Sequence, residues 1–295
     1  MEFYVLVLKT VFIVIAAEPS WEKTPSDYVA EYGDYFEGDM VLTEAQRKEI
    51  EAAIMPDYDN GDNTPKNGLV NATKRWPNNI VVYDIYENHF NKKQKQMIEE
   101  ALQDIAGKSC VQFRRRKSQN EYAVMLQSWR PGCFSQVGCN QASNSRNSQV
   151  FNLADNCFHH GIIVHEMMHT LGFYHMQSSY DRDEYVTIVF ENIEDGFKKN
   201  FAKYTNDTVT NFGVPYDYSS LMHYGEKAFS KNGQKTIIPK KEGAKIGQRE
   251  GLSEGDIVKL NRMYNCTREE TTTAKAPIFN WDFLDKLPKP YDFRH

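Results

Sequence analysis

Short apolar runs along the chain predict strands. Residues 80–83 are an unbroken apolar run typical of a buried strand. Residues 111–113 and 122–126 are two further strand candidates. The chain shows no internal repeat, so these strands are expected to belong to one sheet-containing body rather than to a repeat array.

Three segments predict helices. Residues 44–54 form a short amphipathic stretch in a polar N-terminal region. Residues 91–106 predict a longer amphipathic helix, whose apolar face carries Ile98, Leu102 and Ile105. A third helix is expected from about residue 161 to residue 171, where Gly172 ends it. Together with the strand candidates, these helices predict an α+β fold.

The two ends of the chain differ from its middle. Residues 1–17 hold an apolar run that is too short to span a bilayer comfortably and that ends in small residues, which predicts a cleaved signal peptide. Glu2 and Lys9 are irregular in such a peptide, and a buried helix or strand is the alternative. Residues 56–66 read as an exposed, turn-rich linker open to proteolysis. Residues 267–295 predict a flexible tail.

Composition narrows the class of protein. The 295 residues are 40% hydrophobic and 25% charged, which is ordinary for a soluble globular protein. A net charge of -5 without a long basic run argues against nucleic acid as a partner, and no later segment is long enough to span a membrane. Five cysteines suit an oxidising exterior, so we expect a secreted, extracellular protein. Its candidate glycosylation sites are Asn71, Asn206 and Asn265.

One motif carries the chemistry: His165-Glu166-Met167-Met168-His169-Thr170-Leu171-Gly172-Phe173-Tyr174-His175. Helical residues four apart share a face, so His165 and His169 can bind one metal ion. Glu166 can reach a water on that ion without binding the ion itself. Gly172 lets the chain leave the helix and bring in His175 as a third ligand. Three imidazoles leave an open position, which is typical of a catalytic zinc site.

Chance accounts for parts of this pattern but not for the whole. A His-Glu-x-x-His sequence alone arises in roughly one protein per hundred of this length. The correctly spaced Gly172 and His175 add to it, and so does the downstream stretch 220–224, Ser-Leu-Met-His-Tyr. A lone methionine usually fills a gap in a core and a lone tyrosine usually packs. In combination they predict a zinc site with a methionine-bearing turn beneath it.

These motifs are similar to those of the metzincins, and the chain resembles the astacin family in particular. Further stretches support the resemblance, which runs over residues 36–266: Asp-Arg-Asp at 181–183, Val-Pro-Tyr-Asp-Tyr at 214–218, Ile-Gly-Gln-Arg at 246–249, Gly-Leu-Ser at 251–253 and Asp-Ile at 256–257. The resemblance implies a two-lobed catalytic domain over residues 67–266, preceded by a pro-segment at 18–66. In that domain a twisted, mainly parallel sheet with an antiparallel edge strand would lie beside an active-site helix, with zinc at the floor of the cleft.

The resemblance also implies roles for single residues. One zinc ion per chain would be bound by His165, His169 and His175. Glu166 would be the general base and then the general acid. Tyr224 would bind zinc in the resting enzyme and swing away to stabilise the oxyanion, while Met222 would form the hydrophobic base under the metal.

Cysteines and an arginine complete the implied set. Two disulfides match those of the family, Cys110 with Cys266 and Cys133 with Cys157, which leaves Cys139 as a spare thiol. Arg249 resembles a residue near the S1′ pocket, which implies a preference for acidic side chains after the cleaved bond. An ordinary surface arginine is the alternative.

The pro-segment contains Phe36-Glu37-Gly38-Asp39, which is similar to the Phe-x-Gly-Asp latency motif of the family. The Asp39 carboxylate would occupy the open zinc position in the latent form and displace the water that the reaction needs. The alternative is a solvated turn, since Gly-Asp is a common turn pair.

The chain departs from the family after its third histidine. The family usually has a glutamate there, which anchors the buried new N-terminus of the mature enzyme, and this chain has Met176. The resemblance places the mature start near Asn67, after Lys66, which suits a trypsin-like activating protease. A glycan on Asn71 would conflict with a buried terminus. Either Asn71 is unmodified, or the terminus stays outside, or cleavage falls after Arg75.

The predicted reaction is hydrolysis of internal peptide bonds in protein or peptide substrates. Zinc lowers the pKa of a bound water to about 7, Glu166 takes its proton, and zinc and Tyr224 share the developing charge. We expect the substrate to add as a strand to the sheet edge at residues 122–128. One alternative is a secreted zinc-binding protein that cleaves nothing, although such a protein needs neither Glu166 nor Tyr224. Another is a matrix-type protease, which would need a cysteine latency switch in the pro-segment, and the sequence argues against it because no cysteine precedes Cys110.

Overall fold

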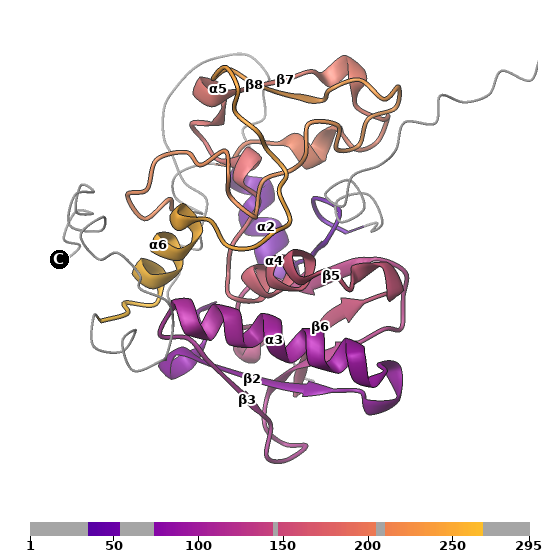
Figure 1. Ribbon diagram of the computed structural model, residues 1–295, viewed down its shortest axis with the longest axis vertical. Helices are drawn as coiled ribbons and strands as arrows, with labels where there is room; N and C mark the ends of the chain where they lie inside the picture. Colours follow the sequence, from indigo (N-terminus) through magenta and orange to yellow (C-terminus); the bar gives the residue numbers. More distant parts are fainter. Residues whose placement is uncertain (1–34, 54–73, 144–146, 205–209, 268–295) are drawn as a thin grey trace, which may run out of the picture.

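The computed structural model describes residues 35–53, 74–143, 147–204 and 210–267 (Figure 1). The predicted signal peptide, the linker 56–66, Asn71, Asn206 and residues 268–295 of the predicted tail lie outside these ranges. The helices are α2 (Glu44–Ala53), α3 (Lys92–Lys108), α4 (His160–Thr170), α5 (Arg182–Tyr185) and α6 (Glu254–Met263). The strands are β1 (Met40–Val41), β2 (Ile80–Ile85), β3 (Gln112–Arg115), β4 (Ala123–Gln127), β5 (Cys133–Gln136), β6 (Ser148–Leu153), β7 (Val186–Ile188) and β8 (Ile237–Pro239).

The main sheet is mixed and has the strand order β1-β5-β6-β4-β2-β3. Its neighbouring strands are parallel except for β5 and β6, which pair antiparallel with Cys133 opposite Leu153. The predicted α+β fold, with a mainly parallel sheet and one antiparallel strand at its side, is therefore confirmed.

The prediction that residues 122–128 form the edge of the sheet is wrong. β4 (Ala123–Gln127) is hydrogen-bonded to β2 on one side and to β6 on the other. In the part that follows residue 74, β5 and β3 are the two edge strands. The free side of β5 is covered by β1 from the N-terminal segment (residues 35–53), with Met40 opposite Ser135. The order of strands in a sheet depends on contacts between distant segments, which a single apolar run does not encode.

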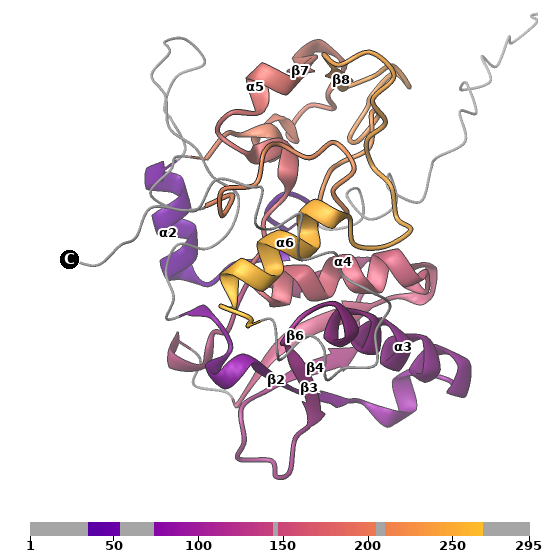
Figure 2. The same cartoon turned by 60° about the vertical axis from the view of Figure 1, so that its left-hand side comes forward.

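Two helices pack side by side on one face of the sheet, as Figure 2 shows for α3 and α4. α3 begins with a capping box, in which the Asn91 side chain accepts a hydrogen bond from the Gln94 amide and the Gln94 side chain accepts one from the Asn91 amide, both 2.9 Å long. Its buried face carries Ile98, Ala101, Leu102 and Ile105. This face includes the three residues predicted from helical periodicity.

α4 is buried over almost its whole length, so it lacks the one-sided pattern of a surface helix. It ends in a Schellman motif: the Phe173 amide donates to the Met168 carbonyl at 3.0 Å and the Gly172 amide to the His169 carbonyl at 2.8 Å. Gly172 has a φ of 107°, a conformation that favours glycine. The chain therefore turns sharply after the helix, as the sequence predicts.

A second lobe lies on the other side of α4, as Figure 1 shows for the ribbon that contains α5, β7 and β8. It has a smaller core of its own, formed by Met176, Val186, Ile193, Phe201, Tyr216, Tyr224, Ala228, Phe229 and Ile237. β7 and β8 pair antiparallel within it. α4 and the loop that follows it therefore lie between two packed bodies, which is the two-lobed arrangement expected. No helix in the described ranges has both the length and the hydropathy to cross a bilayer.

The structure contains both disulfides that the resemblance implies. Cys110, after α3, is bonded to Cys266, after α6, and Cys133 of β5 is bonded to Cys157, just before α4. The two disulfides join residues 156 and 24 positions apart. Closing loops of these lengths contributes about 3 to 5 kcal/mol each to stability in the chain-entropy model. Cys139 is a buried free thiol. Asn265 is exposed beside Cys266, and its glycosylation stays a prediction.

The start of α4 is packed directly against the backbone that carries Arg249. A Cβ placed on Gly161 would lie 1.9 Å from the Arg249 carbonyl oxygen, so Gly161→Ala must displace backbone on one side. We expect this variant to lose about 1–3 kcal/mol of unfolding free energy, the usual cost of overpacking. Thermal unfolding measures it. Gly251→Ala is the matched control, because nothing lies within 4 Å of its added Cβ, and an equal loss in both variants would contradict the packing described here.

Candidate metal centre

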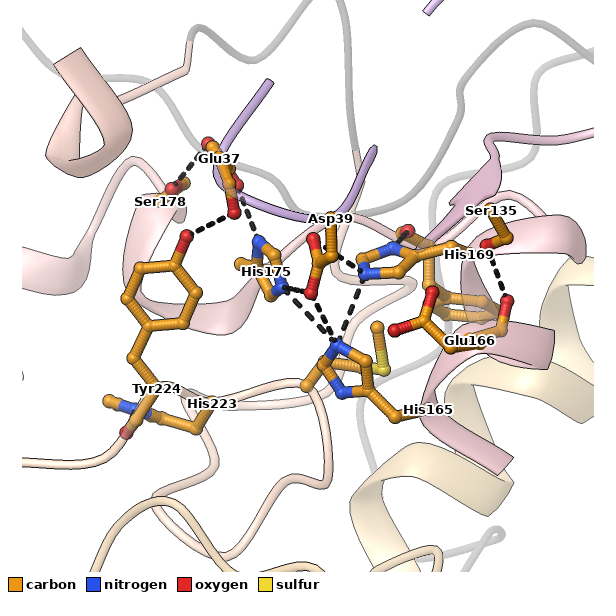
Figure 3. Close-up of polar contacts among 12 residues, drawn as sticks. Glu37, Asp39, Ser135, His165, Glu166, His169, His175, Ser178, His223 and Tyr224 are labelled. Atoms are coloured by element: carbon orange, nitrogen blue, oxygen red, sulfur yellow. Dashed lines mark hydrogen bonds and ion pairs between the residues drawn. The ribbon is translucent and has the colours of Figure 1, made fainter. Parts of the chain in front are cut away.

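Three imidazoles and one carboxylate converge at the end of α4 (Figure 3). His165 and His169 lie one helical turn apart on α4, and His175 comes from the loop after Gly172. Asp39 reaches the same point from the N-terminal segment, next to β1. All four side chains are fully buried. The structure thus brings together the four predicted ligands of the latent form from two segments more than a hundred residues apart.

The Nε2 atoms of the three histidines face one another. His165 Nε2 lies 3.1 Å from His169 Nε2 and 3.3 Å from His175 Nε2. The Asp39 carboxylate completes the group at 3.2 Å from His165, 3.3 Å from His175 and 3.4 Å from His169. Zinc ligands at bond lengths of about 2.0–2.1 Å form a tetrahedron whose edges are about 3.3 Å. The donors therefore have the spacing of a tetrahedral zinc site, and their chemistry fits that ion.

Hydrogen bonds at the other ring nitrogens hold the imidazoles in this orientation. His165 Nδ1 donates to the Leu221 carbonyl at 3.0 Å and His169 Nδ1 to the Phe173 carbonyl at 2.7 Å. His175 Nδ1 donates to the Glu37 carboxylate at 2.8 Å. Because carbonyl oxygens and an ionised carboxylate can only accept, these bonds place a proton on each Nδ1 and direct each Nε2 towards the metal position.

The electrostatic environment acts in opposite directions on two of the histidines, since burial and the charge of Arg249 lower the pKa of His165 to about 3. Burial works against a charged His175, but the carboxylates of Asp39 and Glu37 outweigh it and raise the pKa of His175 to about 9. Burial likewise disfavours the Asp39 carboxylate, yet His175, His169 and His165 hold the pKa of Asp39 well below its usual value. A divalent cation bound by these residues would supply this positive charge without protonation of the ligands.

Glu166 lies beside the group and does not belong to it. Its backbone carbonyl accepts a hydrogen bond from Ser135 Oγ at 2.7 Å, which ties α4 to β5. Both of its carboxylate oxygens are buried, and neither has a hydrogen-bond partner among the described residues. Burial and the nearby charge of Asp39 raise the pKa of Glu166 well above its usual value. Burial and Asp39 thus both act against the charged form of Glu166.

Tyr224 is held by the N-terminal segment rather than by the metal-binding group. Its hydroxyl donates to the Glu37 backbone carbonyl at 2.6 Å, and its ring lies 4.5 Å from that of His175 between centroids. Burial and the charges of Glu37 and Asp39 raise the pKa of Tyr224 well above its usual value, so its hydroxyl stays a donor. Its roles as a resting zinc ligand and oxyanion donor stay predictions.

The methionine-bearing turn is hydrogen-bonded to His165 through the Leu221 carbonyl and to the residue after His175, while the role of Met222 as a hydrophobic base under the metal stays a prediction. The Met222 carbonyl accepts a hydrogen bond from the Met176 amide at 2.8 Å, which joins the turn to the residue after His175. Arg249 supports the same turn, since its Nη1 donates to the carbonyls of Leu221 and His223 at 3.0 Å each. Arg249 is thus partly buried structural support, and its contact with acidic substrate side chains stays a prediction.

Sequence reasoning missed the role of Glu37. Glu37 is fully buried, with a φ of 46°, and accepts hydrogen bonds from His175, from Ser178 Oγ at 2.8 Å and from the Tyr204 hydroxyl. The available signal in the sequence was that Glu37 lies within the latency-like motif Phe36-Glu37-Gly38-Asp39. An acidic side chain in a turn is usually solvated, however, and its partners lie far away in the sequence.

Comparisons with known proteins agree on one family. A model of the Astacin family, a family of peptidases, matches residues 68–265. The chain is 37% identical over 251 residues to zinc metalloproteinase nas-15 of Caenorhabditis elegans, covering 83% of this chain and 42% of that protein. It therefore spans less than half the length of that relative. It is 40% identical over 205 residues to seminal metalloprotease 1 of Drosophila melanogaster, covering 68% of this chain and 82% of that protein.

A solved structure shares the fold. High choriolytic enzyme 1, a hatching enzyme zinc-protease from the medaka Oryzias latipes, superposes with a TM-score of 0.58 at 36% sequence identity. The match covers 65% of this chain and 94% of that chain. The zinc cofactor predicted from the histidine motif is thus the metal named in several of these similar proteins.

Metal removal tests the site directly. We expect the full-length chain to retain one zinc ion after dialysis, as measured by elemental analysis, and His169→Ala to retain much less, because it removes one of four donors. Chelation should lower the unfolding temperature, since a ligand present at about 1,000 times its Kd stabilises the folded state by about 4 kcal/mol. His160→Ala, at the partly exposed start of α4, is the control. Equal zinc in all three proteins would contradict the assigned ligands.

Proposed function

The chain belongs to the astacin family of peptidases, and from this premise we propose that it is a secreted zinc-dependent endopeptidase made as a latent precursor. The observation that carries the proposal is the tetrahedral spacing of His165, His169, His175 and Asp39, in which the fourth donor comes from the N-terminal segment. The two disulfides support an extracellular location, because they persist in oxidising environments.

Glu166 is the proposed proton carrier. Zinc, when bound, supplies Lewis acidity that activates a water and polarises the carbonyl of the scissile bond. Glu166 takes the proton from the attacking water and returns it to the departing amine. Burial and the charge of Asp39 both raise the pKa of Glu166, so the loss of Asp39 removes one of these two causes and favours the ionised carboxylate that can accept a proton. Removal of the N-terminal segment therefore both opens a metal position and prepares Glu166.

Tyr224 is the proposed oxyanion donor. Its hydroxyl is protonated and points to the Glu37 carbonyl while the N-terminal segment is present. When that segment is removed, the hydroxyl loses its acceptor and is free to donate to the oxygen that becomes negative during the reaction. The N-terminal segment thus blocks the fourth metal position through Asp39 and also engages the Tyr224 hydroxyl through the Glu37 carbonyl.

The side of β5 is the proposed binding site for substrate. In the structure this side carries β1, whose Met40 and Val41 lie opposite Ser135 and Gln136. After removal of the segment, an extended peptide can use the same backbone groups, which would give affinity with little dependence on side chains. This site replaces the one expected at residues 122–128, since both sides of β4 are already paired.

Latency would rest on several buried contacts of one short turn. Asp39 takes the fourth donor position, Glu37 binds the Nδ1 of His175, and the Glu37 carbonyl accepts from Tyr224. Met40 is buried in the main core, and Gln46 of α2 donates to the Val137 carbonyl at 2.8 Å. A trypsin-like protease cutting in the region between α2 and Trp76 would separate this turn from the domain that holds the histidines.

The assigned base is tested by Glu166→Gln. We expect the variant, processed with trypsin, to bind zinc as the wild type does but to cleave casein with a kcat lower by about 10²–10⁴-fold, the usual contribution of general acid–base catalysis. Glu191→Gln, an exposed acid of the second lobe, is the matched control. A wild-type rate for Glu166→Gln would remove Glu166 from the mechanism. A processed wild type that binds zinc but cleaves nothing would favour the non-cleaving zinc-binding protein.

Latency is tested by Asp39→Ala in the uncut precursor. We expect this variant to cleave casein well above the rate of the wild-type precursor, because the fourth metal position is no longer occupied by a side chain. Mass spectrometry must show that the assayed chain is intact. Glu44→Ala on the exposed face of α2 should remain latent. A fully latent Asp39→Ala precursor would contradict the assigned switch.

A further inference from the structure

A buried ammonium group lies behind the metal centre and takes no part in the mechanism described above. Lys259 of α6 is 2% exposed, and its Nζ donates to the Met176 sulfur at 3.1 Å. Lysine is almost never buried without a partner of opposite charge, and a thioether is only a weak acceptor. Met176 directly follows the metal-binding His175. The position and burial of this lysine therefore need an explanation.

Carboxylates near Lys259 offset part of the cost of burying its charge. Burial lowers the pKa of Lys259, while the charges of Asp256, Asp217 and Asp181 act to raise it. Asp256 lies one turn earlier on α6 and is itself buried, which raises its own pKa, and Lys259 acts to lower it again. Asp256 and Lys259, three residues apart on α6, thus each favour the charged form of the other, while burial is the larger effect and leaves the pKa of Asp256 raised and that of Lys259 lowered.

Asp256 connects this pair to the turn under the metal. Its carboxylate accepts hydrogen bonds from Ser220 Oγ at 2.6 Å and from the Leu221 amide at 2.7 Å. The Leu221 carbonyl in turn accepts the bond from His165 Nδ1 that sets the orientation of that imidazole. Hydrogen bonds to an ionised carboxylate are stronger than those to a neutral one. A cation that favours the ionised form of Asp256 therefore strengthens its bonds to Ser220 and Leu221, and so fixes the Leu221 carbonyl that orients His165.

Lys259 is therefore linked to two of the metal ligands through other residues. Through Met176 it touches the residue after His175, and through Asp256 it supports the turn that orients His165. Met176 stands where the sequence resemblance leads one to expect a glutamate that anchors the new N-terminus. A thioether carries no charge with which to hold that terminal ammonium, and the Lys259 ammonium already lies against its sulfur.

We propose that Lys259 is an internal positioning cation that replaces the new N-terminal ammonium behind the metal centre, so that the activity of the processed protein does not depend on which residue becomes its N-terminus. This inference rests on the proposed peptidase function. It makes Lys259 a positioning residue, since it acts on the metal ligands through Met176 and through Asp256 with its Leu221 partner. It also removes the conflict between a buried N-terminus and a glycan on Asn71, because the terminus has no need to be buried.

The first test varies the N-terminus and leaves Lys259 unchanged. Full precursors carry the recognition sequence of a site-specific protease in place of residues 62–66. One begins at Asn67 after cleavage, a second lacks residues 67–68, and a third has Gly-Ser added before Asn67. With zinc bound, we expect the three products to cleave a peptide with kcat/KM values within about twofold of one another, well below the 10–100-fold effect of losing a supporting contact at a metal site. A tenfold or greater loss on shifting the terminus would overturn the proposal.

The second test removes the ammonium. We expect Lys259→Met to lower kcat by about 10–100-fold, the range found for residues that support metal ligands, with KM changed much less. The swap Lys259→Met with Met176→Lys returns an ammonium to the same site and should recover most of kcat, which a merely space-filling lysine would not predict. Lys199→Met, at an exposed position, is the control. An unchanged kcat in Lys259→Met, or a swap that recovers nothing, would contradict the positioning role.

The outcomes separate this inference from the proposed function. If no processed form cleaves peptide although zinc is bound, the peptidase assignment fails. If the forms cleave but their rates follow the position of the N-terminus, only the role of Lys259 fails. If Lys259→Met does not fold, the series of N-termini still decides, because it retains the wild-type lysine.

Discussion

The orientation of three imidazole rings is the constraint on which the rest of the structure depends. Each ring must present Nε2 to one point, and each is held there by a hydrogen bond at Nδ1. The acceptors come from three places: the methionine-bearing turn at Leu221, the end of α4 at Phe173, and Glu37 of the N-terminal segment. The two lobes and the Schellman motif at Gly172 serve this geometry, since they bring those acceptors to α4.

One of the three acceptors belongs to the segment that is removed on activation under the proposed function. Glu37 orients His175 from outside the domain that carries the other ligands. Removal of the segment thus takes away a metal donor, Asp39, and an acceptor for a metal ligand in the same step. The mature site must hold His175 by other means, and the packing of the adjacent Met176 against Lys259 and the Met222 carbonyl supplies contacts that remain.

Much of this arrangement follows from local sequence patterns. The spacing of His165 and His169 specifies one helical face, Gly172 ends α4 as predicted, and the periodic residues of α3 are buried. The four-donor group was predictable because each ligand lies in a motif with a fixed local geometry. The edge of the sheet was not, because residues 122–126 form an apolar run whether the strand lies at the edge or in the interior. Only the pairing of β4 with both β2 and β6 decides this.

The roles of Glu37 and Lys259 were not predictable for a different physical reason. Each carries a charge that is normally solvated, and its burial depends on partners more than eighty residues away, His175 for Glu37 and Met176 for Lys259. The departure at Met176 was visible in the sequence, but alone it showed only that an expected anion is missing. The structure adds the cation that lies at the same position, and the two observations together have a simple electrostatic explanation. Under the proposal, a site that supplies its own buried cation needs no anion to attract one, which explains how Met176 can stand where the resemblance leads one to expect a glutamate.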